Sequence, residues 1–238
     1  MGFQKKTLQI FRSIIKEIKN NDNFKLKFPK CIYWLNGAPG AGKDTHAKFI
    51  QKICCIKNNP VVVSSLLKTK QLQEIKDSAS LASDSDVTKI LFKHILFTNY
   101  TKGVIIDGYP RTKIQAQCVR LLYKYLKMLF TKKINKMQPI FRIVVLIVDE
   151  KVSINRQLMR GKKALIHNQK ILKTGKGILQ EIRKTDISKK SAKIRYLIFR
   201  DNSYLSLNSL KKYFPYYEID ASKNIKLVKK EIFQSLIN

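Results

Sequence analysis

The feature that most constrains this chain is a glycine-rich turn between an apolar segment and a helical pattern. Cys31–Gly37 reads CIYWLNG, and after it come the six residues Ala38, Pro39, Gly40, Ala41, Gly42 and Lys43. Such a turn lets backbone N–H groups surround phosphate oxygens, while the helix dipole and the lysine add positive potential. The spacing G-x-x-x-x-G-K therefore predicts a phosphate-binding loop, in preference to a turn that binds nothing.

Apolar and helical segments alternate through the rest of the chain. The apolar runs predict strands at 31–37, 61–63, 103–107, 142–148 and 216–219. Between and after them, helical patterns cover about 43–56, 86–97, 112–132, 152–160, 187–212 and the residues after 222. Five such alternations predict an α/β fold, with a five-stranded parallel sheet covered by helices on both faces.

Two segments lie outside this alternation. Residues 1–30 are basic, and we expect a packed amphipathic helix there because five apolar residues recur at helical spacing, namely Leu8, Phe11, Ile14, Ile15 and Ile18. A transit peptide is the alternative, but Glu17, Asp22 and the scarcity of arginine argue against it. Residues 161–181 show no clear period and contain three glycines, so we predict an irregular insertion.

Composition excludes several classes of protein. No apolar run approaches the roughly 20 residues of a membrane span. Four cysteines without a C-x-x-C pair and three separated histidines indicate neither a zinc site nor a disulfide framework, so a reducing compartment, cytoplasmic or plastid-type, is expected. The formal net charge is +32. Attraction to polyanions would explain it, but the lysines are spread along the whole chain, which favours a solvated lysine-rich surface.

Two further motifs accompany the glycine-rich turn. Asp107-Gly108-Tyr109-Pro110-Arg111-Thr112 follows the third apolar run, and Gln115 comes three residues later. Near the insertion, arginines stand at four positions: Arg156, Arg160, Arg183 and Arg195. Arg156 and Arg160 are four residues apart, on one face of a predicted helix.

Together the three motifs resemble those of adenylate kinases and related nucleoside-monophosphate kinases, from about residue 31 to the C-terminus. The family patterns are G-x-P-G-x-G-K-G-T, D-G-[FY]-P-R-[ST]…Q, and R-x-x-x-R before a lid with R-x-D-D…R after it. Within the family, RKTD…RY is similar to a plant- and plastid-type branch. The resemblance implies a P-loop kinase core at 31–238, an acceptor lobe at about 61–98, a lid at about 161–183 and a monomer.

The resemblance also implies roles for individual residues. The catalytic set would be Lys43, Arg111, Arg160, Arg183 and Arg195. ATP would be bound by Gly37, Ala38, Pro39, Gly40, Ala41, Gly42, Lys43, Asp44, Thr45 and Arg156. The nucleoside monophosphate would be bound by Ser64, Lys68, Gly108, Tyr109, Arg111 and Gln115. Asp107 would orient Mg²⁺ through water, Arg111 would grip the acceptor phosphate at two points, and Gln115 would contact a base edge.

The chain departs from the family at several positions. Asp44 replaces a glycine, and it could hold a water of the magnesium shell, favour the helix terminus or repel phosphate. Thr185 replaces an aspartate, and Arg195 falls one residue late. In the acceptor lobe the family usually shows S-T-G-D-[LM]-[LI]-R; here, among other changes, Val63 replaces the threonine, Ser64 the glycine and Lys68 the arginine.

These departures leave the acceptor open. AMP is the expected acceptor by resemblance, so that the reaction would be ATP + AMP = 2 ADP, with Mg²⁺ as cofactor. The alternatives are a UMP/CMP-type kinase, a P-loop kinase for another small acceptor, and an inactive P-loop protein that binds nucleic acid through its positive charge. No membrane association is expected.

Overall fold

The core of the molecule is a five-stranded parallel sheet. The computed structural model describes residues 2–20, 29–67, 83–100, 102–133 and 138–237. In this part of the chain the strand order is β2-β3-β1-β4-β5. The strands are β1 (Cys31–Gly37), β2 (Val61–Val62), β3 (Val104–Asp107), β4 (Ile140–Ile147) and β5 (Tyr216–Asp220). All pairings are parallel, which confirms the predicted sheet.

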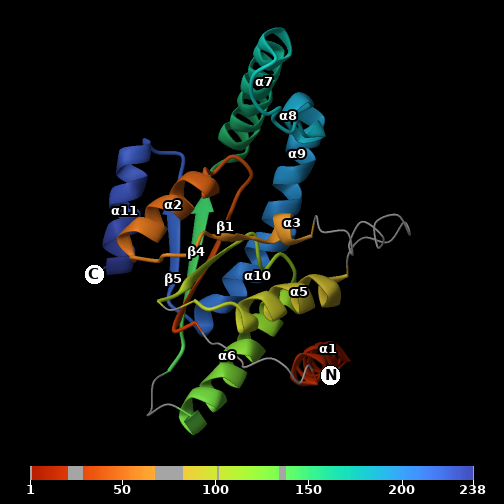
Figure 1. Cartoon of the computed structure of the whole chain (residues 1–238), viewed down its shortest axis with the longest axis vertical. Helices are drawn as coiled ribbons and strands as arrows, with labels where there is room; N and C mark the ends of the chain where they lie inside the picture. Colours follow the sequence, from red (N-terminus) through yellow and green to blue (C-terminus); the bar gives the residue numbers. More distant parts are fainter. Residues whose placement is uncertain (1, 21–28, 68–82, 101, 134–137, 238) are drawn as a thin grey trace.

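Helices cover both faces of this sheet (Figure 1). The first half of the chain contributes α1 (Gly2–Lys19), α2 (Lys43–Ile53), α3 (Val63–Leu66), α5 (Asp84–Phe97) and α6 (Lys113–Lys133). The second half contributes α7 (Glu150–Thr174), α8 (Lys184–Ile187), α9 (Lys189–Ile198), α10 (Leu205–Asn208) and α11 (Ile225–Ile237). Of the helices that the structure describes, none is long and apolar enough to cross a membrane.

The second strand and the helix predicted over 187–212 differ from the observed elements. The second strand ends at Val62, because Val63 already begins the short helix α3. The single helix expected over 187–212 is a succession of shorter pieces, in which a π-helical segment, Phe199–Tyr204, follows α9 and a 3₁₀ segment, Ser209–Lys212, follows α10. Hydrophobic spacing does not separate these helix types here, because segments of 6 and 4 residues complete little more than one turn each.

The predicted irregular insertion over 161–181 is wrong for most of its length. Helix α7 runs without a break through Gly161 and ends at Thr174, where Gly175 caps it in a left-handed conformation. Gly161 is needed for packing: a methyl group there would overlap the backbone carbonyl of Asp186. The sequence shows no helical hydrophobic period here, because apolar residues of the outer part of α7, such as Leu165 and Leu172, are exposed and do not mark a buried face.

The N-terminal segment forms a packed helix. Phe11, Ile14, Ile15 and Ile18 on α1 are buried, as their spacing predicted. Helix α1 lies against α5 and α6 (Figure 1). The Phe11 ring meets Phe92 of α5 edge to face, with 6.2 Å between ring centroids. The apolar face of α1 is therefore part of the hydrophobic core.

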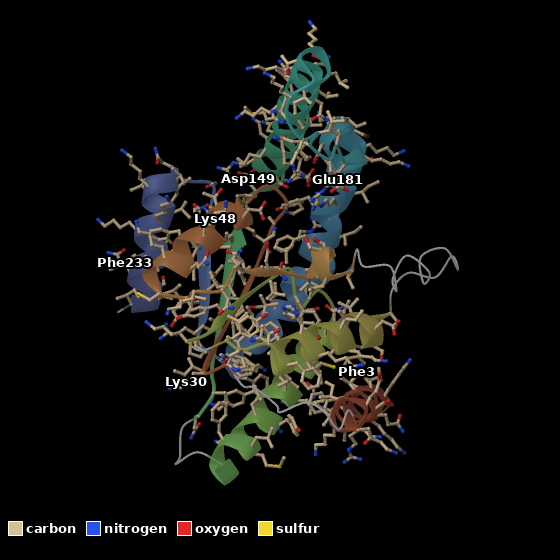
Figure 2. All side chains as sticks on the ribbon, viewed as in Figure 1. Phe3, Lys30, Lys48, Asp149, Glu181 and Phe233 are labelled. Carbon is tan, nitrogen blue, oxygen red and sulfur yellow. The ribbon has the colours of Figure 1, made fainter. Side chains whose placement is uncertain are left out.

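Replacing Phe11 by alanine should destabilise the fold. Removing a buried aromatic ring leaves a cavity that costs about 3–5 kcal/mol. The free energy of unfolding, measured by denaturant titration, should fall by that order. Phe3→Ala in the same helix is the matched control, because Phe3 is 49% exposed and should change stability by less than about 0.5 kcal/mol (Figure 2). Equal losses for both variants would mean that α1 does not pack as described.

Candidate active site

The glycine-rich turn forms a loop at the carboxyl end of the central strand. Gly42, with φ of 76°, lies in the left-handed region that favours glycine, and α2 begins at the next residue. The loop is anchored to its surroundings by Ala38, whose N–H donates to Leu146 O at 2.9 Å, and by Ser153, whose Oγ donates to Pro39 O at 2.8 Å. The predicted phosphate-binding geometry, a loop leading from a strand into a helix, is present.

Lys43 is turned inward toward this loop. Its Nζ donates to the carbonyl oxygens of Gly37 at 3.0 Å and Ala38 at 3.3 Å. Burial lowers the pKa of Lys43 to about 8, although the nearby Asp107 carboxylate works in the opposite direction. An anion entering the loop would stabilise the charged amine, so Lys43 is suited to bind a phosphate group.

Asp107 lies at the end of β3, beside Leu35 of β1. Its Oδ1 is buried and has no hydrogen-bond partner. The pKa of Asp107 is raised above its usual value, because the effect of burial exceeds the opposing effect of the Lys43 charge. An unpartnered carboxylate oxygen beside a phosphate-binding loop fits a hydrated magnesium ion, which usually takes few direct protein ligands. Thr45, in the first turn of α2, lines the same cavity. No cluster of three or more metal-ligating side chains occurs in the described ranges.

The second motif curves away from Asp107 toward α6. Arg111 Nε donates to Gly108 O at 2.8 Å, and burial lowers the pKa of its guanidinium. The Tyr109 side chain is fully buried in the core, where its ring packs against Trp34 with 5.7 Å between centroids. The Gln115 side chain is also buried, and its Oε1 accepts from the Arg111 N–H at 2.8 Å. The sequence motifs predicted that Tyr109 and Gln115 bind the nucleotide. In the structure both side chains are buried and form hydrogen bonds within the protein.

Two arginines of the third motif, Arg156 and Arg195, donate to oxygen atoms of other elements. Arg156 Nη1 donates to Ala221 O at 2.7 Å and to Gly40 O at 3.4 Å, so it joins the loop after β5 to the phosphate-binding loop. Arg195 Nη1 donates to Thr185 Oγ1 at 3.1 Å. Burial lowers the pKa of Arg195 to about 10, and the charges of neighbouring arginines add to the effect.

Arg160 of α7 forms an ion pair with Asp186 of α8. Its guanidinium grips both carboxylate oxygens of Asp186, with Nε donating to Oδ2 at 3.1 Å. Burial by itself would raise the pKa of Asp186, but the hydrogen bonds and charge of Arg160, with the charges of Arg183 and Arg195, lower it. Asp186 was noted in the sequence as part of RKTD, but its role as the partner of Arg160 becomes visible only in the structure.

These elements enclose one cavity of about 380 Å³. The predicted residues that line it are Pro39, Gly40, Gly42, Lys43, Asp44, Thr45, Ser64, Asp107, Arg111, Arg156, Arg160, Arg183 and Arg195. Gly37 and Gly108 line a smaller adjoining cavity of about 130 Å³. Ala38 and Ala41 are buried within the loop, and Lys68 lies outside the described residues.

The cavity also includes residues that sequence reasoning did not assign. Val62, Glu181 and Asp186 lie on its wall. Figure 2 labels Glu181, on the segment that returns from α7 to α8. Six cationic side chains line the cavity, namely Lys43, Arg111, Arg156, Arg160, Arg183 and Arg195. A concave site with this charge is suited to a ligand with several phosphate groups.

Several adenylate kinases are similar to this chain in sequence. No family model matches the chain. It is 28% identical over 211 residues to an adenylate kinase of Prochlorococcus marinus (strain MIT 9301), a match that covers 84% of this chain and 95% of that protein. It is 27% identical over 211 residues to an adenylate kinase of Archaeoglobus fulgidus, covering 82% of this chain and 93% of that protein. An adenylate kinase of Elusimicrobium minutum (strain Pei191) is 26% identical over 220 residues, covering 86% and 96%.

These similarities over most of the chain support the adenylate kinase family. The extent of these matches and the parallel sheet agree with the family expected from the motifs. The plant- and plastid-type branch stays a prediction, because these adenylate kinases do not distinguish it from other branches.

The buried amine gives a prediction for the protein without ligand. Lys43 should titrate near pH 8, more than two units below a surface lysine, in ¹³C NMR spectra of the lysine Cε signals. Asp107→Asn should lower its midpoint further, because the carboxylate favours the charged amine. Asp201→Asn, which removes an exposed acid that does not line the cavity, should leave the midpoint unchanged. A Lys43 signal that titrates together with the surface lysines would contradict the described burial.

Proposed function

We propose that this adenylate kinase family member transfers the γ-phosphoryl group of MgATP to a nucleoside monophosphate, with AMP as the acceptor. The observation that carries the proposal is the single cavity in which Lys43, Asp107 and Arg111 meet the arginines of the lid. The sequences of adenylate kinases match most of the chain, which supports the same reaction. The division into a core, an acceptor lobe at about 61–98 and a lid at about 161–183 belongs to this proposal.

The two nucleotides would occupy opposite sides of the phosphate-binding loop. ATP would bind over Gly37–Thr45, with Lys43 on its outer phosphates and Arg156 beside its base. Ser64, Lys68 and the segment Gly108–Arg111 would hold the acceptor. In the part of the chain that the structure describes, the Arg111 guanidinium bonds to protein only through Nε, to Gly108 O, so both Nη groups are available. A planar guanidinium can contact two oxygens of one phosphate, which an ammonium group cannot do as well.

Catalysis would depend on positioning and charge. The acceptor phosphate oxygen is already anionic, so the reaction needs no general base. Lys43, Arg111, Arg160, Arg183 and Arg195 would neutralise the negative charge that spreads over the transferring group. Asp107 and Thr45 would hold hydrated Mg²⁺, which would supply positive charge to offset that of the phosphate groups. The cavity and the lid would exclude water, which would otherwise accept the phosphoryl group.

The acceptor is tested by direct assay. We expect nucleoside diphosphate to form when the protein is mixed with ATP, Mg²⁺ and AMP, and to form more slowly with CMP, UMP or GMP. Preference for UMP or CMP would move the assignment to the pyrimidine kinases, for which the altered positions Val63, Ser64 and Lys68 leave room. If no acceptor is turned over while RNA binds with a steep salt dependence, the kinase proposal is overturned.

Replacing Arg111 by lysine tests the catalytic site. Arg111→Lys keeps the charge but loses the two-point contact, so kcat/KM for the acceptor should fall by roughly 100-fold with the thermal midpoint preserved. Arg12→Lys, an exposed position on α1, is the matched control and should leave the rate unchanged. An undiminished rate for Arg111→Lys would remove Arg111 from its proposed role.

A further inference from the structure

Asp84 joins the first turn of α5 to the acceptor motif. The residue begins α5 and is half-buried. Its Oδ2 accepts a hydrogen bond from Thr112 Oγ1 at 2.9 Å, and its Oδ1 accepts one from Gln115 Nε2 at 2.9 Å. Both donors belong to the segment that follows Arg111. One carboxylate from a different helix therefore fixes two points of this segment.

The bond to Asp84 decides which way the Gln115 amide faces. A glutamine side chain has a donor end and an acceptor end, whereas an ionised carboxylate can only accept. The donor end of Gln115 must therefore face Asp84, and this leaves Oε1 to accept the Arg111 N–H at 2.8 Å. Without the carboxylate, the amide could turn and present N–H groups to another N–H group.

The backbone position of Arg111 depends on this amide. The Arg111 N–H bonds to Gln115, and its Nε donates to Gly108 O at 2.8 Å, so both ends of the residue are held. The remaining guanidinium N–H groups belong to a side chain that lines the cavity. A turned or displaced Gln115 would release one of these two restraints.

The helix that carries Asp84 is itself firmly placed. Thr88 Oγ1 lies 2.6 Å from the Asp84 backbone oxygen, to which it donates, and 2.9 Å from Tyr109 Oη. From α1, Glu17 pairs with Lys89 at 2.7 Å and Lys93 at 3.0 Å. Helix α1 lies outside the motifs shared with the kinase family, so this part of the support belongs to this chain.

We propose that Asp84 is a positioning residue for the acceptor site: it fixes the Gln115 amide, and the amide in turn fixes Arg111 for the acceptor phosphate. The inference rests on the proposed function, because it assigns Arg111 to the acceptor. It goes beyond the sequence motifs, since Asp84 lies in none of them. It also gives Gln115 a role that does not require contact with a base.

Binding and turnover of AMP in three variants test this proposal. Asp84→Ala removes both acceptors, so the Kd for AMP from calorimetry and the KM for AMP should each rise about tenfold, while the KM for ATP stays within twofold. Asp84→Asn should recover most of the affinity, because its Oδ1 can accept from Gln115 and its amide can donate to Thr112. Asp86→Asn is the matched control: it removes a carboxylate from the same helix turn, but Asp86 bonds only to Ser83 among the interactions described.

The outcomes separate the inference from the function on which it rests. If the wild-type protein neither binds nor turns over AMP or another nucleoside monophosphate, the proposed function fails and the inference fails with it. If the wild-type protein is active and Asp84→Ala binds AMP equally well, the inference alone is overturned. Equal losses for Asp84→Ala and Asp86→Asn would reduce Asp84 to a helix-terminus residue and also overturn it. Asp84→Ser, whose short hydroxyl cannot replace both acceptors, takes the place of Asp84→Ala if that variant does not fold.

Discussion

The parallel pairing of β1 with its two neighbours is the constraint on which the site depends. The register places Leu35 beside Asp107 and Gly37 beside Leu146, so the loops that follow these strands begin at the same edge of the sheet. Parallel strands bring their carboxyl ends together, and residues far apart in the sequence then share one site. Moving the register by one residue would turn Asp107 to the other face of the sheet.

Gathering positive charge in a cavity is costly, and the structure offsets the cost locally. Lys43 donates to two carbonyl oxygens, Arg156 to carbonyls of two loops, and Arg160 to the Asp186 carboxylate. Charged groups taken out of water are tolerated when hydrogen bonds satisfy them. The same bonds fix the directions of the side chains, so the arrangement that stabilises the charges also presents them to an anionic ligand.

Short-range sequence patterns predicted the sheet and most of the cavity, because strand periodicity and the glycine-rich turn depend on neighbouring residues. Three features needed the fold. The outer part of α7 is exposed on most sides, so it shows no hydrophobic period. Gly161 appeared to be a loop residue because its packing against Asp186 crosses 25 positions of the sequence. The roles of Tyr109 and Gln115 inside the protein follow from contacts with α5, which no motif contains.

The unbroken course of α7 has a mechanical consequence. The helix starts at the sheet, carries Arg156 and Arg160 in its first turns, and projects beyond the body of the molecule (Figure 1). At about 1.5 Å per residue it is a rod roughly 37 Å long. A rotation of about 10° at its base would sweep the far end through roughly 6 Å, while Arg156 would move by roughly 1.6 Å and Arg160 by roughly 2.6 Å. Helix α7 can thus act as a lever, whose outer end travels far while the part that carries the two arginines moves much less.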